Sequence, residues 1–230
     1  MKAKILKFSI RSARLAGRIV REGGVIVFPT DTVYGVGCDP FNDKSVKRIY
    51  EIKRRPGKPM PILAKELNDI EKIAEMNEIE FEIASKLWPG QLTILLNAKP
   101  SFRKSRLVSE DGMVGVRIPA CLQTLIIIEE SGGLLVGTSA NISGLPPPQN
   151  IQELDEKILN SVDLVIDGGR CLIGKPSTVI KLVNNDRLRI LRLGSITIER
   201  LKEVCEELDL TLDIESRYPL EDQEESGLKP

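Results

Sequence analysis

Residues 11–30, RSARLAGRIVREGGVIVFPT, decide the fold class, because the hydrophobic pattern changes its period within this one segment. Apolar residues recur at helical spacing over residues 11–22, and Gly23-Gly24 then ends the predicted helix. A run of β-branched and aromatic residues at 25–28 follows at once and predicts a buried strand. Helix, turn and strand in this order are typical of an α/β protein.

The same alternation continues along the chain to about residue 208. Further helices are predicted at 43–54, 66–76, 78–88, 121–130, 151–160 and 196–208, and strands at 60–64, 91–97, 113–118, 133–138, 161–166, 177–183 and 187–193. Asn184-Asn185-Asp186 separates the last two strands and predicts a hairpin, so we expect a twisted, open sheet of mixed parallel and antiparallel strands flanked by helices.

The composition is that of a folded protein in the cytoplasm. The chain has 230 residues, 41% hydrophobic and 29% charged, which is enough to bury a core. No apolar run approaches the roughly 18 residues that a membrane span requires, and the N-terminus lacks the apolar core of a signal peptide. Its four cysteines lie far apart without a CxxC pair, so we expect buried free thiols.

The chain contains no histidine. This absence excludes Ser-His-Asp and Cys-His nucleophile systems and the usual catalytic zinc ligands. Catalysis would have to use Lys, Arg, Asp, Ser, Thr or Tyr side chains, backbone amides and the charges of the substrate. No protein metal site is predicted.

The charges balance at 33 basic and 33 acidic residues, but they are segregated along the chain. Residues 44–58 hold seven lysines or arginines against Glu51, which predicts a site that binds anions. Lys53 and Arg55 lie just before Pro56, and a guanidinium beside an ammonium suits a polyphosphate. The alternatives are a solvated helix face and cations that offset the dipole of a helix C-terminus.

Polar clusters interrupt the apolar pattern at predicted strand ends and favour a pocket there. Thr30-Asp31-Thr32 follows the first predicted strand, and Gly137 to Gly144 forms a loop rich in hydroxyl and amide groups. That loop could wrap an anion or satisfy its own backbone, and it matches neither a Walker loop nor GxGxxG. Arg117 lies in an apolar strand, so it must form a structural ion pair or bind a ligand, for which a carboxylate would suit its fork.

Seven short motifs occur in a fixed order along the chain. They are Pro29-Thr-Asp-Thr-Val-Tyr-Gly-Val-Gly37, Lys53-Arg-Arg-Pro56, Trp88-Pro-Gly90, Val116-Arg-Ile-Pro119, Thr138-Ser-Ala-Asn-Ile-Ser-Gly144, Ile166-Asp-Gly-Gly169 and Ser177-Thr-Val179. In this order they resemble the YrdC-like family of threonylcarbamoyl-AMP synthases, over about residues 5–205. The resemblance implies a YrdC-like catalytic domain with a concave basic cavity, which we place at residues 1–208.

The same resemblance implies an L-threonylcarbamoyladenylate synthase, a nucleotidyltransferase that joins L-threonine, bicarbonate and ATP into threonylcarbamoyl-AMP and pyrophosphate. Mg²⁺ would accompany ATP as substrate. The product would pass to a protein complex that modifies tRNA, and RNA itself is a possible partner. The roles implied for individual residues are threonine binding by Thr32, Arg117 and Ser177, nucleotide binding by Lys53, Arg55, Lys58, Thr138, Ser139, Asn141 and Arg192, and catalysis by Lys53 and Arg55.

Two departures from the family pattern bear on the site. Many members carry an Asn-Pro pair and a threonine-contacting histidine after Lys-x-Arg-Pro, whereas Lys58-Pro59-Met60-Pro61-Ile62 is one residue shorter and lacks histidine. Longer members append a second domain. Here we expect residues 209–230 to be an acidic, linker-like tail, because residues 199–225 hold eleven acids against three bases. Our hypothesis is that this tail, which contains Tyr218, folds over the pocket.

Two other functions remain open at the level of sequence. The first is a non-catalytic protein that binds double-stranded RNA or tRNA in the same basic cavity, since cations alone give affinity for phosphate backbones. The second is a relative that handles carbamoyl-adenylate in hydrogenase maturation, a role of larger multidomain chains. Pyrophosphate release that depends on threonine and bicarbonate would separate the synthase from both.

Overall fold

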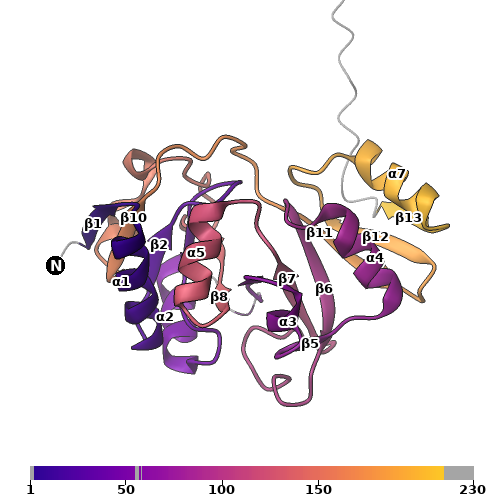
Figure 1. Cartoon of the computed structure of the whole chain (residues 1–230), viewed down its shortest axis with the longest axis horizontal. Coiled ribbons are helices and arrows are strands. Elements are labelled where there is room, and N and C mark those ends of the chain that lie inside the picture. The colour runs from indigo at the N-terminus through magenta and orange to yellow at the C-terminus, as the bar shows by residue number, and fades with distance from the viewer. Residues whose placement is uncertain (1–2, 55–56, 58, 215–230) are drawn as a thin grey trace, which may run out of the picture.

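The structure, a computed structural model, describes residues 3–54, 57 and 59–214. The roles predicted for Arg55 and Lys58, and the hypothesis about Tyr218, therefore lie outside the described residues. Mixed sheets flanked by helices, as predicted, form the framework of the molecule. Figure 1 shows α1, α2 and α5 beside the first sheet and α4 and α7 beside the second.

The first sheet begins at one end of the molecule with the N-terminal strand. Within the described residues its order is β1 (Lys4–Lys7), β10 (Leu164–Asp167), β2 (Ile26–Phe28), β3 (Gly35–Gly37) and β9 (Thr138–Ser139). The first three strands are parallel, and β3 is antiparallel to both β2 and β9. The turn between β2 and β3 therefore carries Thr30-Asp31-Thr32 at the carboxyl end of a buried parallel strand, where α/β sheets commonly bind ligands.

The second sheet is longer and also mixed. Its described strands run in the order β13 (Thr211–Ile214), β12 (Arg187–Arg192), β11 (Thr178–Val183), β6 (Leu92–Ala98), β7 (Met113–Arg117), β4 (Ile62–Ala64) and β8 (Leu134–Val136), with β5 (Ala74–Glu75) paired to β6. The predicted hairpin is confirmed, because β11 and β12 are antiparallel. Since β8 leads directly into β9, the chain passes here from the second sheet to the first.

Helices flank both sheets. They are α1 (Ile10–Arg21), α2 (Asp43–Lys53), α3 (Leu67–Ile70), α4 (Glu78–Leu87), α5 (Leu122–Glu130), the 3₁₀ turn η1 (Ile151–Glu153), α6 (Glu156–Leu159) and α7 (Ile198–Glu207). A capping box between Ser9 and Ser12 starts α1. Gly17 lets α5 approach α1 closely, because a Cβ there would lie 2.2 Å from the carbonyl oxygen of Glu130.

Several short elements differ from the prediction. The helix predicted at 66–76 is the short α3 followed by β5, and the helix predicted at 151–160 is divided into η1 and α6. Three strands, β1, β3 and β9, were not predicted at all. They have only two to four residues, too few to show a period, and pairing with distant strands determines them.

The second sheet extends beyond residue 208, where the predicted domain ends. Residues 211–214, predicted as tail, form β13 and pair in parallel with β12, and Arg189 Nε lies 2.9 Å from Asp213 Oδ2. The acidic composition of the segment favoured a tail over a strand. In the structure, Asp213 is accommodated in the sheet because it pairs with Arg189 on β12. None of the helices in the described part of the chain has the length and apolar character of a membrane span.

Candidate active site

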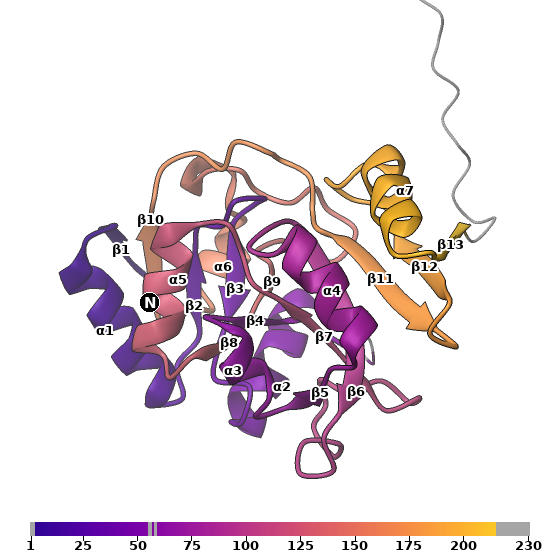
Figure 2. The same ribbon diagram turned by 45° about the vertical axis from the view of Figure 1, so that its right-hand side comes forward.

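A cavity of about 350 Å³ lies between the two sheets. Its walls come from both sheets. The first sheet contributes the turn between β2 and β3 and the strand β9 with Gly137 before it, and the second sheet contributes residues of β4, β6, β7, β11 and β12. In Figure 2 the strands β3, β9, β4 and β7 gather in the middle of the molecule. The volume falls in the range of small-molecule pockets, roughly 300–1,000 Å³.

The second sheet presents alternate residues of three neighbouring strands to the cavity. The lining pairs are Thr93 and Leu95 on β6, Gly115 and Arg117 on β7, and Ser177 and Val179 at the start of β11. Residues two apart on a strand share one face, and these strands are paired in register. The sheet thus places two hydroxyls and one guanidinium on an otherwise apolar surface.

Arg117 is buried, with 5% of its surface exposed, and contacts three other residues. Its Nε donates to the carbonyl oxygen of Gly90 at 2.8 Å, Nη1 donates to Thr32 Oγ1 at 3.2 Å, and Nη2 forms an ion pair with Asp31. Burial lowers the pKa of Arg117, and the charge and hydrogen bond of Asp31 oppose that shift. Arg117 forms a structural ion pair, which is one of the two roles considered for it, and it also lines the cavity.

The Thr30-Asp31-Thr32 turn is held in place by its own hydrogen bonds. Thr30 Oγ1 donates to the carbonyl oxygen of Val33 at 2.6 Å and lies 2.9 Å from Thr32 Oγ1. Gln91 Nε2 donates to the second carboxylate oxygen of Asp31 at 3.0 Å. The carboxylate is thus satisfied by protein donors, and Thr32 faces the cavity beside Arg117.

Ser177 and Arg192 lie on the second sheet beyond Thr93, at β11 and β12. Ser177 Oγ lies 2.8 Å from Thr93 Oγ1, and Arg192 Nη2 donates to the carbonyl oxygen of Ser177 at 2.8 Å and to its Oγ at 3.2 Å. The structure therefore brings Thr32, Arg117, Ser177 and Arg192 to one cavity, although they are up to 160 residues apart in the chain.

The Thr138 to Gly144 loop closes one side of the cavity, and Lys53 holds this loop. Thr138 and Ser139 line the cavity. Lys53, only 1% exposed, donates from Nζ to the carbonyl oxygen of Ser139, and to the carbonyl oxygen of Asn141 at 2.8 Å. Ser139 Oγ in turn donates to Asn141 Oδ1 at 2.5 Å. Lys53 and Asn141 thus stand behind the loop residues that face the cavity.

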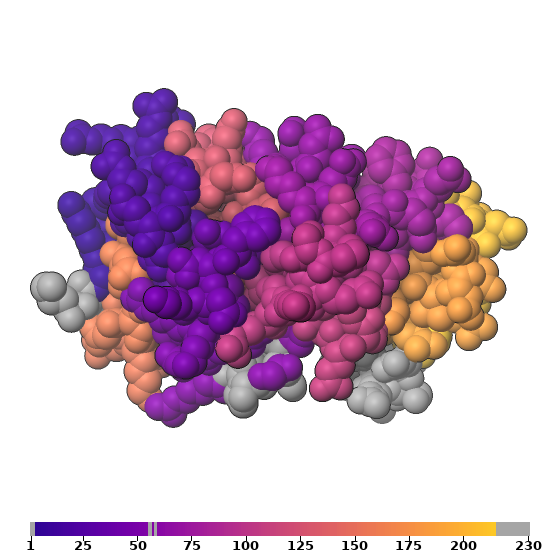
Figure 3. Space-filling view, turned by 90° about the horizontal axis from the view of Figure 1, so that it is seen from below, coloured from indigo at the N-terminus to yellow at the C-terminus, as the bar shows by residue number. Residues whose placement is uncertain are grey.

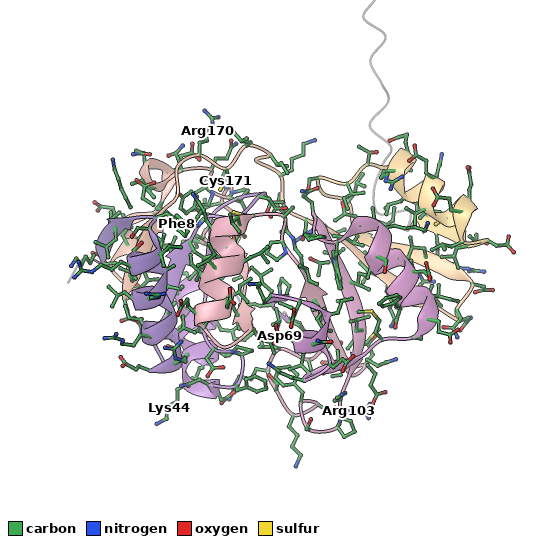
Figure 4. All side chains as sticks on the ribbon, in the orientation of Figure 1. Phe8, Lys44, Asp69, Arg103, Arg170 and Cys171 are labelled. Carbon is green, nitrogen blue, oxygen red and sulfur yellow. The ribbon has the colours of Figure 1, made fainter. Side chains whose placement is uncertain are left out.

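The other described cations of residues 44–54 lie in different surroundings. Lys44 extends away from the molecule at the start of α2 (Figure 4), and Arg48 pairs with Asp163 at 2.7 Å. Among the described residues, then, the cations from 44 to 54 do not form one wall. Lys53 follows Arg48 by five residues, which places the two side chains on different faces of α2.

Several lining residues were missed by reasoning from sequence. Thr93, the one hydroxyl within the apolar strand predicted at 91–97, gave a signal that could have identified it. Met60, Leu63 and Leu95 also line the cavity, but nothing in sequence distinguishes them from core residues. Gly137 was quoted only as part of the loop. A Cβ there would lie 2.3 Å from Leu63 Cγ, so glycine allows β8 and β4 to approach.

Thiols and metal ligands contribute little to the described site. The four cysteines are free, as predicted, and burial raises the pKa of Cys171 to about 11, which keeps it a thiol. Figure 4 places Cys171 and Arg170 on the loop above the first sheet. Within residues 3–54, 57 and 59–214, no three His, Cys, Asp or Glu residues gather as metal ligands.

Comparison with known proteins identifies relatives over most of the chain. The model of the Sua5/YciO/YrdC family, described as "Telomere recombination", matches residues 18–194. A putative threonylcarbamoyl-AMP synthase of Methanocaldococcus jannaschii is 40% identical over 183 residues, covering 79% of this chain and 85% of that protein. A threonylcarbamoyl-AMP synthase of Pyrococcus abyssi is 36% identical over 199 residues, covering 85% of this chain but only 57% of that protein.

The fold agrees with a solved structure of the same family. The crystal structure of P. abyssi Sua5 complexed with L-threonine superposes with a TM-score of 0.82 at 32% identity. The match covers 92% of this chain and 62% of that one, so this chain spans less than two thirds of the longer protein.

Proposed function

This chain belongs to the Sua5/YciO/YrdC family, and from that premise we propose that it is an L-threonylcarbamoyladenylate synthase. The reaction joins L-threonine, bicarbonate and ATP into threonylcarbamoyl-AMP, pyrophosphate and water. The observation that carries the proposal is the convergence of Arg117, Thr32 and Ser177 on one small cavity beside the Thr138–Ser139 strand. Relatives named for this activity, and one solved with L-threonine, support it.

The cavity has the chemical groups that an amino acid with a short polar side chain requires. The guanidinium of Arg117 offers a charge-assisted hydrogen bond to the carboxylate of threonine. Thr32, Thr93 and Ser177 can accept hydrogen bonds from the ammonium group, and they can donate to the hydroxyl group or accept from it. Apolar residues of the same wall, including Met60, Leu63 and Leu95, would contact the methyl group.

The nucleotide would lie on the side formed by the Thr138 to Gly144 loop. Ser139 would contact it directly, Asn141 and Lys53 would fix the loop, and Arg192 would approach from the other wall. By family resemblance, Arg55 and Lys58 would bind the phosphates. Mg²⁺ would arrive with ATP and neutralise the phosphate charge, because the described wall supplies no set of carboxylate ligands.

Catalysis would then consist mainly of positioning and charge stabilisation. The amine of threonine attacks the carbon of bicarbonate or of the carbon dioxide in equilibrium with it, and water is lost as the carbamate forms. A carbamate oxygen then attacks the α-phosphorus, the bond to the bridging β-phosphate oxygen breaks, and pyrophosphate leaves. None of these steps requires histidine. The product would serve tRNA modification in the cytoplasm, through transfer to another protein.

The proposal is tested by measuring pyrophosphate release with ATP, Mg²⁺ and bicarbonate, in the presence and absence of L-threonine. We expect release only with threonine, and we expect Arg55→Ala to lower it at least tenfold, about 1.4 kcal/mol of transition-state binding. Release that ignores threonine would contradict the proposed function. Unchanged release by the variant would remove Arg55 from the site.

A further inference from the structure

A row of polar side chains crosses the second sheet on the side that faces the cavity. Along the strand order β12, β11, β6 and β7 the row consists of Arg192, Ser177, Thr93 and Arg117, and all four residues line the cavity. Figure 3 shows the hairpin of β11 and β12 (orange) directly beside the segment that leads from β6 to β7 (magenta). Thr93 therefore stands between the hydroxyl of Ser177 and the guanidinium of Arg117.

Thr93 and Ser177 carry two hydroxyl hydrogens, and the described protein accepts only one of them. The two oxygens lie 2.8 Å apart, so one hydrogen lies between them. Arg192 Nη2 donates to Ser177 Oγ at 3.2 Å, which adds a hydrogen rather than an acceptor. In the described part of the chain, neither hydroxyl has a carbonyl or carboxylate partner. One hydrogen of the pair is therefore left for an acceptor in the cavity.

Two buried hydroxyls outside the cavity are satisfied by backbone carbonyls. Thr178 Oγ1 donates to the carbonyl oxygen of Ile196 at 2.9 Å, and Ser131 Oγ donates to that of Ile127 at 2.7 Å. Thr93 is as deeply buried, with 2% of its surface exposed, but among the described residues it has no such acceptor. A buried donor without an acceptor destabilises the fold. Its retention on the cavity wall indicates a ligand oxygen rather than a packing role.

The geometry of the sheet indicates which of the two hydroxyls faces the ligand. Continued by one residue, the register of β6 and β7 sets Thr93 opposite Arg117, whereas Ser177 lies one strand farther away. Neighbouring strands are about 4.8 Å apart, so a carboxylate held by Arg117 brings the amine of the same amino acid close to Thr93. The hydrogen bonds then run from Arg192 to Ser177, from Ser177 to Thr93 and from Thr93 to the ligand. Each donor in such a chain strengthens the next.

We propose that Thr93 is a further substrate-binding residue, which donates its hydroxyl hydrogen to the carbamate formed during the reaction. The inference rests on the proposed function and deepens it. When the neutral amine of threonine adds to bicarbonate, the N–C bond forms, and one amine proton leaves with the hydroxyl of bicarbonate as water. The two carbamate oxygens then share one negative charge. One of them attacks the α-phosphorus, and the other accepts from Thr93, a donor fixed in place before the charge develops.

The experiment measures pyrophosphate release by the full-length chain over a range of bicarbonate concentrations. Thr93→Val keeps nearly the same shape without the hydroxyl, and Thr93→Ser keeps the hydroxyl. We expect Thr93→Val to lower kcat/KM for bicarbonate at least about tenfold, and Thr93→Ser to stay within about threefold of wild type. The Kd for L-threonine, measured by titration calorimetry in degassed buffer without ATP or bicarbonate, should change by less than about twofold in both variants. The control is Ser131→Ala, which removes a buried hydroxyl that does not line the cavity and should leave the kinetics unchanged.

Three results would overturn the inference about Thr93. They are equal kcat/KM values for bicarbonate in Thr93→Val and wild type, equal losses in Thr93→Val and Thr93→Ser, or a parallel loss of threonine affinity in Thr93→Val. Thermal unfolding at the wild-type midpoint would show that the variants are folded, and Thr93→Ala replaces the valine variant if that midpoint falls.

The same assay separates this inference from the proposed function. A wild-type chain without threonine-dependent pyrophosphate release would contradict both. An active wild type whose Thr93→Val variant responds to bicarbonate in the same way would contradict the role of Thr93 alone.

Discussion

Arg117 links two parts of the candidate site that are distant in sequence, the Asp31-Thr32 turn and the Gly90 carbonyl. Replacing it with a neutral residue would leave Asp31 as an unpaired buried charge, which costs about 3–5 kcal/mol. Arg117→Lys keeps the charge but cannot make all three contacts. We expect the KM for threonine to rise at least tenfold while the KM for ATP changes little, measured by pyrophosphate release. Equal increases in both would argue that Arg117 is only structural.

We expect a different effect from replacing Lys53, because its ammonium group contacts the Thr138 to Gly144 loop rather than the cavity. Lys53→Met leaves the Ser139 and Asn141 carbonyls without this donor, so we expect a loss of about 1–3 kcal/mol in the free energy of unfolding and a raised KM for ATP. Lys65→Met is the matched control, since Lys65 pairs with the exposed Glu129 and should cost under about 1 kcal/mol.

The two lysine variants are compared by urea unfolding and by kinetics. If Lys53→Met kept wild-type stability and wild-type KM but lost kcat, Lys53 would act on the reacting phosphates directly. A positioning role predicts instead that stability and the KM for ATP change together.

Individual polar residues of the site were the most predictable from sequence. Thr32 and Arg117 were placed near a pocket by polar groups at predicted strand ends, whereas the resemblance alone placed Ser177 there, and all three line the cavity. Leu63 and Met60 could not be found, because a pocket wall and a protein core select the same side chains. The carbonyl groups that accept from Lys53 could not be predicted either, because every residue has a backbone carbonyl and the sequence does not show which ones lie near Lys53.

At the scale of elements, helices with two or more turns and strands within apolar runs, such as β2, β6 and β7, were predictable, whereas β1, β3 and β9 were not. Residues 10–21 show a full helical period and a cap, so α1 agrees with its prediction within one residue. The strand β9 has two residues, and pairing with β3 some 100 residues earlier in the chain determines it. Such long-range pairing does not register in a local pattern.

The strand β13 gives a test at this scale. A chain ending at residue 208 lacks the pairing of Thr211–Ile214 with β12 and the Arg189–Asp213 ion pair. We expect it to be less stable than a chain ending at residue 214 by at least about 1 kcal/mol, or about 2–4 °C in Tm. Asp213→Asn in the longer chain, which removes the ion pair alone, should cost less. Equal melting temperatures for the two truncated chains would mean that β13 contributes no stability.

At the scale of the whole molecule, the site exists only because two sheets meet. The first sheet contributes the Thr30–Thr32 turn and Ser139, and the second contributes Arg117, Thr93 and Ser177. The order of motifs along the chain predicted that these residues act together, but not that they face one another across an interface between sheets. Arg11, Arg14 and Arg18 of α1 line a separate groove beside β1, away from this cavity.

We propose that this cavity joins threonine, bicarbonate and the adenylate of ATP in one product. The most direct measurement is mass spectrometry of the nucleotides formed from ATP, Mg²⁺, L-threonine and ¹³C-labelled bicarbonate. We predict a new adenylate that contains threonine and carries the labelled carbon, in amounts equal to the pyrophosphate released. Threonine-dependent pyrophosphate release whose nucleotide product lacks the label, or the appearance of AMP or ADP alone, would contradict the account.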